Sequence, residues 1–371
     1  MYLVLYFIYR FFSCLRNHQQ FTKQENPYLC FKYYFDDKTS AKKSFFRVFK
    51  EVNRLFGYWH QFPDTYFIFC HYLKEYNDFN LIKSFLPQGA YYNFCKGGLE
   101  SSSYRIIVND KILFHDFMEY YELPTSKVLF AFRNNHFFIN KKLVDEEAID
   151  ILLLGLKDDI VFMKLPSAGA ANGVFVIKKK YDDYYFNDEK VNAEWIKNKY
   201  KGNSVFFEER IEQDPIFKSY NPDTINTVRI LTKNYSGKIE IVSAAARFGR
   251  KGQFVDNIHA GGIGVSINLE SGCMERYGAR RFDSKKYLYH PDSGFEFNGV
   301  QVPQWEQIKK LVLKTVAFLP QFRSLGFDIV TTTYGPIVLE INTGAGMDLA
   351  QIGKEMGIAD KFDKHLTRRF K

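Results

Sequence analysis

The feature that most constrains the fold is a pair of apolar segments near the C-terminus. Residues 326–330 (GFDIV) and 337–342 (IVLEIN) are rich in β-branched side chains, and a Gly-Pro pair lies between them. This pattern is typical of two adjacent antiparallel strands joined by a turn. Asp328, Glu340 and Asn342 interrupt the apolar runs, where a plain core strand would carry no oxygen-bearing side chain. The segment therefore predicts a hairpin that also carries chemistry.

The register of this hairpin decides whether the polar side chains meet. Paired residues in a hairpin have a constant sum of residue numbers, so an odd-length turn centred on Tyr334 places Asp328 opposite Glu340. Asn342 then shares a face with Glu340, because side chains alternate along a strand. Two carboxylates and an amide suit Mg²⁺, which prefers oxygen ligands. An even-length turn would put the carboxylates on opposite faces, and the site could not form.

A solvated strand face is the alternative interpretation of the same residues. Like charges directly opposite each other destabilise a sheet, and a buried carboxylate is costly without a partner. The apolar Val338, Leu339 and Ile341 indicate a buried strand. We therefore interpret Asp328 and Glu340 as ligands of a cation.

Composition limits the classes of function. A chain of 371 residues can hold two or three domains, and its formal net charge of +9 favours acidic partners such as phosphates, anionic sugars or lipid headgroups. We expect no nucleic-acid partner, because no basic-aromatic motif of the known modules occurs. The five cysteines are scattered and form no CxxC pair, which predicts a reducing compartment, the cytoplasm, with neither zinc nor disulfides.

The first sixteen residues are mostly apolar and aromatic, with Arg10 and Arg16 among them. The apolar run is too short to span a membrane, and a signal peptide would carry its positive charge before the run. We expect a buried or interfacial helix. A peripheral contact with the inner face of the membrane, through the two arginines and the aromatic rings, is the alternative.

Two parts of the chain differ in pattern. Residues 1–104 form a helical region of unclear role, in which apolar side chains near helical spacing indicate an amphipathic helix within residues 40–56. Beyond it, Asp110 is suited to cap a helix at 111–122, and Pro124 ends that helix. Another amphipathic helix is predicted at 302–318. Strands are predicted at 127–132, 136–139, 160–164, 174–177, 204–208, 227–232, 239–247 and 262–269.

Two further segments have the residue types of a nucleotide site. Lys164 ends an apolar strand and precedes a loop of small residues with Ser167, Gly169 and Gly173, in which backbone N–H groups can approach phosphate oxygens. The loop is not a P-loop, because no Gly-Lys-Ser/Thr opens a helix, and a plain turn is the alternative. Residues 206–211 (FFEERI) run from a strand into charge and can offer an adenine edge and carboxylates; an ordinary exposed strand end is the alternative.

Taken in chain order, these segments resemble the ATP-grasp superfamily, and more closely its sugar-transfer-associated branch. The resemblance extends over about residues 105–355, whereas the first hundred residues do not match the usual first domain. Seven degenerate motifs carry it: 109–111 (NDK), 163–173, 207–211 (FEERI), 226–230 (NTVRI), 246–249 (ARFG), 255–262 (VDNIHAGG), and 326–328 with 340–344.

The resemblance implies an α+β fold with two α+β lobes and the nucleotide between them, preceded by the helical region. The domains would be residues 1–104, 105–212 and 213–371, and the cofactors ATP and Mg²⁺. The site residues would divide as follows: Lys111 and Lys164 on the phosphates; Ser167, Gly169 and Gly173 in a flap; Glu208, Glu209 and Ile211 at the adenine hinge; and Asp328, Glu340 and Asn342 on Mg²⁺.

The chain departs from the family pattern at one charged position. Many carboxylate ligases of this fold have an arginine two residues before the first metal aspartate, and Gly326 stands there. Arg229 and Arg247, on predicted strands, are candidates to supply the missing charge. Asn257 and His259 are candidates to face the acceptor or a phosphate, although a lone histidine is more often structural.

The activity that the resemblance implies is ATP-dependent ligation of a carboxylate to an amine through an acyl phosphate. The family context suggests cell-surface polysaccharide or capsule biosynthesis, with an amino acid joined to a sugar acid or amino sugar, either small or glycan-linked. Phosphoryl transfer depends on positioning and charge rather than on a nucleophilic side chain, and no Ser-His or Cys-His pair is evident. A kinase acting on a sugar or polyol hydroxyl and a non-catalytic binding component are the alternatives. The oligomeric state stays open.

Overall fold

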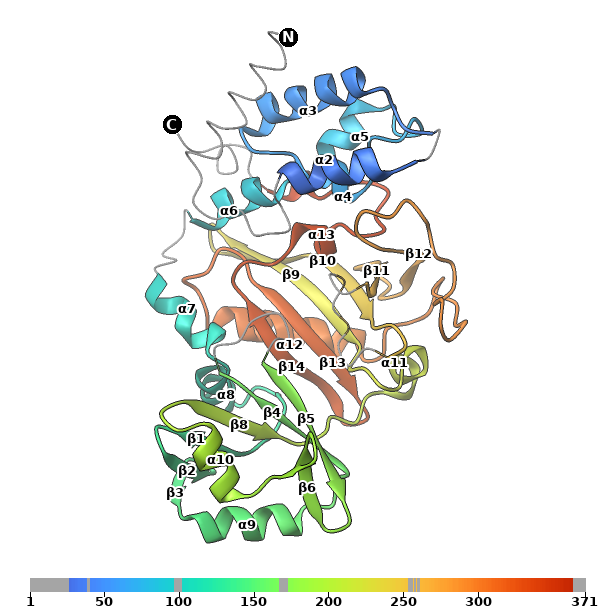
Figure 1. Ribbon diagram of the computed structural model, residues 1–371. Helices are drawn as coiled ribbons and strands as arrows, with labels where there is room; N and C mark the ends of the chain where they lie inside the picture. Colours follow the sequence, from blue (N-terminus) through green and yellow to red (C-terminus); the bar gives the residue numbers. More distant parts are fainter. Residues whose placement is uncertain are drawn as a thin grey trace.

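The computed structural model describes residues 27–38, 41–96, 102–166, 173–252, 256, 258 and 261–362. Within them, a helical N-terminal region, a six-stranded sheet and an eight-stranded sheet follow one another from top to bottom of Figure 1. All pairings in both sheets are antiparallel. The α+β fold class and the helical N-terminal region are as expected from the sequence. None of the described helices is both long and apolar enough to cross a membrane.

The eight-stranded sheet lies at the bottom of Figure 1, and its strand order is β3-β2-β1-β8-β4-β5-β6-β7. Helices α9 (Glu146–Gly155) and α10 (Ala193–Lys199) bury Ile149, Leu153 and Ile196 in its core. The strands are β1 (Val128–Arg133), β2 (His136–Ile139), β3 (Lys142–Val144), β4 (Ile160–Lys164), β5 (Val174–Lys180), β6 (Asp183–Phe186), β7 (Glu189–Lys190) and β8 (Ser204–Glu208).

The six-stranded sheet has the order β12-β11-β10-β9-β13-β14, and α12 (Trp305–Ala317) covers one of its faces. Ile308 and Val312 of this helix share a core with Val228, Ile230 and Phe327 of the sheet. The strands are β9 (Thr227–Tyr235), β10 (Lys238–Phe248), β11 (Ile263–Ile267), β12 (Met274–Ala279), β13 (Gly326–Thr332) and β14 (Gly335–Asn342), and α11 (Pro215–Tyr220) precedes β9.

Helix α8 (Lys111–Tyr120), which follows α7 (Ser102–Asn109) in the chain, packs against both sheets. Phe114 and Met118 belong to the core beneath α12, whereas Ile112 packs with Ala131 and Phe206 of the other sheet. Asp110 caps α8, because its carboxylate accepts the backbone N–H groups of the second and third helical residues, each at 3.0 Å. Helix α8 therefore begins where the two sheets approach each other, and Lys111 is its first residue.

The helical region packs on the face of the six-stranded sheet that α12 leaves open. Tyr91 and Phe94 share a core with Leu231 and Val242 of the sheet and with Phe362 near the C-terminus. The helices are α2 (Pro27–Asp36), α3 (Phe45–Trp59), α4 (Asp64–Ile68), α5 (Phe79–Ser84) and α6 (Gln88–Lys96), joined there by α13 (Met347–Ala350) and a 3₁₀ turn (Ala359–Lys361). The six-stranded sheet is thus the middle of three layers.

The β13–β14 hairpin differs from the expected register in an instructive way. Thr332 pairs with Gly335, so the turn holds two residues and is even in length, not odd. A bulge at Leu339 then shifts the pairing by one residue, and Asp328 still lies opposite Glu340. Val338 and Ile341, three positions apart, both bury in the core beneath α12, which the extra residue makes feasible. The predicted pairing is confirmed, but by a different route.

Candidate functional site

The predicted metal ligands lie on the face of the six-stranded sheet that points away from α12. Asp328 stands opposite Glu340, and the Asn342 side-chain amide donates to Oδ2 of Asp328 at 3.4 Å. Their neighbours Phe327 and Ile341 point to the core on the other face. The structure therefore brings all three predicted ligands together.

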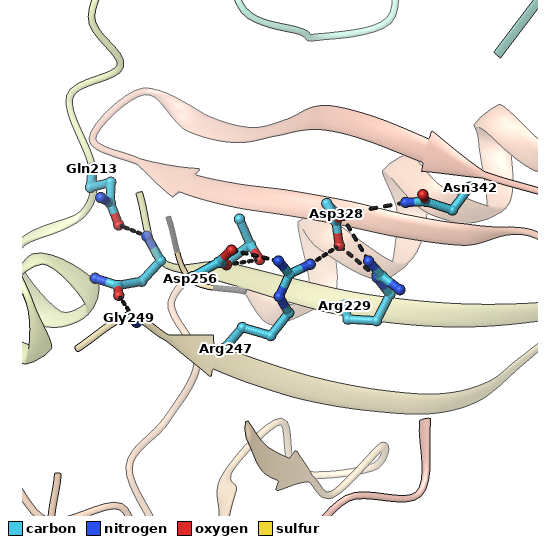
Figure 2. A network of polar contacts seen from close by, with 9 residues as sticks. Gln213, Arg229, Arg247, Gly249, Asp256, Asp328 and Asn342 are labelled. Atoms are coloured by element: carbon cyan, nitrogen blue, oxygen red, sulfur yellow. Dashed lines mark hydrogen bonds and ion pairs between the residues drawn. The ribbon is translucent and has the colours of Figure 1, made fainter. Parts of the chain in front are cut away.

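Two arginines hold the carboxylate of Asp328, as Figure 2 shows. Arg229, directly opposite on β9, donates from Nε to Oδ1 at 2.6 Å and from Nη2 to Oδ2 at 2.9 Å. Arg247 on β10 donates from Nη1 to Oδ1 at 2.9 Å. Burial alone would raise the pKa of Asp328, but the two guanidinium groups outweigh it and lower the pKa to about 2. Asp328 is therefore ionised, and the two predicted arginines are beside it.

Arg247 also contacts a carboxylate that the sequence analysis gave no role. Its Nη2 donates to Oδ1 of Asp256 at 2.5 Å, and the hydroxyl of Thr227 donates to the other oxygen. Burial raises the pKa of Asp256 although Arg247 opposes the shift. The available signal was its place inside one of the resembling motifs. Asn257 and His259, the candidates next to it, lie outside the described residues.

Within the described part of the chain, no counter-ion directly contacts Glu340. It is half-buried, and among the described residues it forms neither a hydrogen bond nor an ion pair. Burial and the charge of Asp328 raise its pKa, while Lys111 and the two arginines act in the opposite direction. A divalent cation would offset both the burial of Glu340 and its repulsion by Asp328, because it offers positive charge and direct ligation to the carboxylate.

The donor set fits Mg²⁺, which prefers oxygen atoms. Within the described residues no group of three or more His, Cys, Asp or Glu side chains could hold a metal ion. The candidate therefore consists of two carboxylates and one amide oxygen, from Asp328, Glu340 and Asn342.

Close packing around Gly326 explains why no arginine stands two residues before Asp328. A Cβ atom at this position would lie 2.7 Å from Cβ of Ala345 and 3.6 Å from Cδ of Arg229. No side chain fits there without movement of its neighbours. Arg229 supplies positive charge to Asp328 from the adjacent strand instead.

A second charged cluster lies on the eight-stranded sheet and α8. The Lys164 ammonium contacts Oε2 of Glu208 at 2.5 Å, and Nε2 of His115 contacts Oε1 at 2.7 Å. Burial would raise the pKa of Glu208, but Lys164 and His115 together lower it to about 2. His115 was not among the predicted site residues, although its place one helical turn after Lys111, on the same face of α8, was an available signal.

Lys111 lies within the influence of both clusters. Burial lowers its pKa, Lys164 adds to that effect, and Glu340 and Glu208 oppose it. Its backbone N–H donates to the carbonyl of Pro166 at 3.1 Å, which ties α8 to the start of the small-residue loop. Four of the predicted residues, from both sheets, are therefore electrostatic neighbours: Lys111, Lys164, Glu208 and Glu340.

The remaining predicted residues surround this cluster or lie outside the described chain. Gly173 closes the base of the small-residue loop through its carbonyl, which accepts the Leu165 N–H at 2.9 Å. Glu209 follows β8, and its N–H donates to the Lys127 carbonyl at 3.2 Å. Ile211 is half-buried in the segment that leads to the second sheet. Ser167 and Gly169 lie outside the described residues.

Three solved enzyme structures are similar to this chain in fold, at low sequence identity. D-alanyl-alanine synthetase A from Vibrio cholerae is 13% identical over 65% of this chain and 57% of its own, with a TM-score of 0.38. D-alanine–D-alanine ligase from Bacillus anthracis, complexed with ATP, is 13% identical over 69% and 59%, at 0.36. The ATP-grasp ligase PsnB, complexed with a minimal precursor, Mg and ADP, is 14% identical over 72% and 62%, at 0.38.

The chain thus spans less than two thirds of each of these proteins, and no curated protein matches it. A family match is stronger: residues 96–365 match the model of the sugar-transfer associated ATP-grasp family, which covers most of the chain. The described fold and the order of the motifs agree with this match. The chain belongs to the sugar-transfer associated ATP-grasp family.

Proposed function

We propose that this protein is an ATP-dependent, ADP-forming carboxylate–amine ligase that uses Mg²⁺. The observation that carries the proposal is the closeness of a pair of carboxylates to a pair of lysines. Asp328 and Glu340 lie opposite each other on the hairpin, and Glu340 and Lys164 are both electrostatic neighbours of Lys111. Carboxylates suit a divalent cation and lysines suit phosphates, and Mg·ATP carries both.

Each predicted residue has a role in this proposal. Asp328, Glu340 and Asn342 would hold Mg²⁺, which supplies charge neutralisation at the phosphates. Lys111 and Lys164 would contact those phosphates beneath the flap of Ser167, Gly169 and Gly173. Glu208, Glu209 and Ile211 would lie along the adenine and ribose. We also propose the domain division at residues 104 and 212.

In the proposed reaction, a carboxylate oxygen of the substrate attacks the γ-phosphorus of ATP, and the bond to the ADP oxygen breaks. The acyl phosphate is then attacked by an amine, which loses a proton as phosphate leaves and the amide forms. Arg229 and Arg247 would stabilise negative charge on the carboxylate and on the transferred phosphoryl group. Asn257 and His259 would face the acceptor.

We propose that the substrates belong to cell-surface polysaccharide biosynthesis, such as an amino acid joined to a sugar acid or amino sugar, free or glycan-linked. The net charge of +9 suits an anionic substrate. The described cysteines are free, which supports a reducing cytoplasmic location: Cys30, Cys70, Cys95 and Cys273.

The residues predicted to contact the membrane, 1–16, lie outside the described residues. An exposed aromatic patch elsewhere in the helical region supports the proposal of peripheral contact with the inner face of the membrane. Phe35 is 60% exposed and Phe46 is 83% exposed, and the ring of Phe45 lies between them at centroid distances of 5.8 and 6.1 Å. Exposed aromatic rings suit the interface of a lipid surface, and the net charge of +9 favours an anionic one.

Vesicle sedimentation tests this contact. We expect the protein to sediment with phosphatidylglycerol vesicles more than with phosphatidylcholine vesicles, and Phe35→Ser with Phe46→Ser to reduce that binding. Equal binding by the double variant would refute the contact.

A screen for ADP release tests the ligase proposal. Amino acids are offered in pairs with sugar acids or nucleotide sugars, and products are identified by mass. Hydroxylamine should trap the acyl phosphate as a hydroxamate. A phosphorylated sugar without any hydroxamate would favour the kinase alternative, and absence of turnover despite ATP binding would favour the non-catalytic one. Mg²⁺-dependent ATP binding that survives in Asp328→Ala with Glu340→Ala would refute the site assignment.

A further inference from the structure

The loop between Asn342 and α13 is held by a side chain from the helical region. The Gln88 side-chain amide donates from Nε2 to the carbonyl of Ala345 at 3.0 Å, and its Oε1 accepts the N–H of Met347 at 2.7 Å. One amide group thus satisfies a backbone acceptor and a backbone donor on either side of Gly346. Ala345 and Met347 are buried, so water cannot replace these bonds.

Gln88 is itself fixed in place. It is the first residue of α6, is 2% exposed, and donates its backbone N–H to Oδ1 of Asp64 at 3.1 Å. Asp64 is influenced by the charges of Asp348 on α13 and of Arg281, which contact each other at 2.8 Å. The backbone of Gln88, and with it the side-chain amide, is therefore anchored in a buried polar network that joins the helical region to the six-stranded sheet.

The loop has little room to move while these contacts persist. A Cβ atom on Gly344 would lie 3.4 Å from the ring of Tyr92, which follows Gln88 by one helical turn on α6. A Cβ atom on Gly346 would lie 2.2 Å from the carboxylate of Asp348. Tyr92 thus encloses the loop at Gly344 on the side that faces the helical region, whereas Asp348 restricts Gly346 from within its own segment.

On its other side the loop contacts the hairpin of β13 and β14. Ala345 packs against Gly326, which pairs with Asn342, the third predicted metal ligand. Displacement of Ala345 would therefore be transmitted to the strand that carries Asp328 and to Asn342.

We propose that Gln88 is a positioning residue for the active site, acting through the backbone of Ala345 and Met347 on Gly326 and Asn342. Residues 27–95 precede the family match at 96–365, so the helical region supplies support that the family model does not include. The kinetic part of this inference rests on the proposed function, whereas its structural part does not.

The matched control is Gln351, a second fully buried glutamine at the same interface. It exchanges hydrogen bonds with the backbone of Leu86, at 2.8 and 3.0 Å, and donates to the Met347 carbonyl at 3.1 Å. It contacts neither Ala345 nor the Met347 N–H. Gln351→Met removes four side-chain hydrogen bonds from this interface and Gln88→Met removes two, so the control is the more disruptive change. Only Gln88→Met leaves the Ala345 carbonyl and the Met347 N–H without their partner.

Hydrogen exchange followed by mass spectrometry on the full chain tests the structural part. We expect peptides within residues 343–350 to exchange at least about tenfold faster in Gln88→Met than in the wild type, because the Met347 N–H loses its acceptor. In Gln351→Met the faster exchange should lie near Leu86 and Ile358, whose N–H groups Gln351 accepts. Unchanged exchange at 343–350 in Gln88→Met would overturn the proposal.

The kinetic part uses ADP release from Mg·ATP with the substrate pair that the screen identifies. We expect kcat to fall roughly 10- to 100-fold in Gln88→Met, because small displacements of positioned groups cost rate, while KM for ATP changes less than about twofold. Equal losses of kcat in Gln88→Met and Gln351→Met would overturn the positioning role.

Two further outcomes are separable. If Gln88→Met does not fold, Tyr92→Ala releases the loop at Gly344, and the same two measurements apply with a smaller expected effect. If the wild type does not bind Mg·ATP, the proposed function fails, and hydrogen exchange alone decides whether Gln88 holds the loop.

Discussion

Asp328 and Glu208, one in each sheet, are both almost fully buried and both ionised, yet they are held by different cations. Asp328 lies between two arginines, whose charge is permanent, whereas Glu208 lies between Lys164 and His115. A second carboxylate, Glu340, adjoins the first of these sites, and a second lysine, Lys111, adjoins the other. Similar ion pairs thus hold both buried carboxylates, while the additional charged group differs: a carboxylate at the proposed cation site and a lysine at the proposed phosphate site.

The largest effect should come from Asp328, which we propose as a ligand of Mg²⁺. Asp328→Asn keeps the shape of the side chain but removes a charged ligand, so we expect ADP release to fall at least about 100-fold. The measurement is ADP release across a titration of Mg²⁺. Glu208→Gln is the control, because it should leave the dependence on Mg²⁺ unchanged. A normal Mg²⁺ titration in Asp328→Asn would contradict the assignment.

Acid should weaken the fold through Glu208. Its pKa is about 2 in the folded protein against an ordinary 4.5, so its stabilising contribution is complete above pH 4.5 and is lost as the pH falls toward 2. The shift corresponds to about 3 kcal/mol. Urea unfolding at pH 6 and pH 3 should show this loss in the wild type and less of it in Glu208→Gln. A Glu208→Gln variant with the full acid dependence would show that other carboxylates cause it.

Gly326→Ala should show that Arg229 and Ala345 occupy the space next to Asp328. The added methyl group would approach Ala345 at 2.7 Å, which should lower the free energy of unfolding by about 1–3 kcal/mol. Gly57→Ala in α3 is the control, because no atom lies within 4 Å of that position, and alanine there should stabilise the helix by about 0.5–1 kcal/mol. Thermal or urea unfolding measures both. Equal stability of the two variants would contradict the close packing.

The smallest effect should come from the neutral substitution at the phosphate site. Glu208→Gln leaves Lys164 in place but without its counter-charge. We therefore expect the affinity for ATP to rise by roughly tenfold, with little change in the response to Mg²⁺. Binding of a fluorescent ATP analogue is the measurement, and Glu209→Gln, with a more exposed carboxylate, is the control. A larger effect in Glu209→Gln would place the important carboxylate one residue later.

Local patterns were enough to predict most of the longer elements, although α9 and β12 were not predicted. The cap at Asp110, the helix that it begins and the central strands of both sheets follow from side-chain spacing within a few residues. The two-residue strand β7 and the short helices α4 and α13 have no such pattern, because their formation depends on partners elsewhere in the chain. The roles of His115 and Gln88 were not predicted for the same reason: their partners Glu208 and Ala345 are distant in sequence.

The hairpin of β13 and β14 separates what the sequence determined from what the tertiary structure decided. The sequence alone determined two strands, a turn, and Asp328, Glu340 and Asn342 among apolar neighbours. It did not determine the register, because a two-residue turn by itself would have put the two carboxylates on opposite faces. The bulge at Leu339 restored their pairing, since Val338 and Ile341 both have to bury against the core beneath α12. Packing against that helix, rather than the turn, therefore decided that a cation site could form.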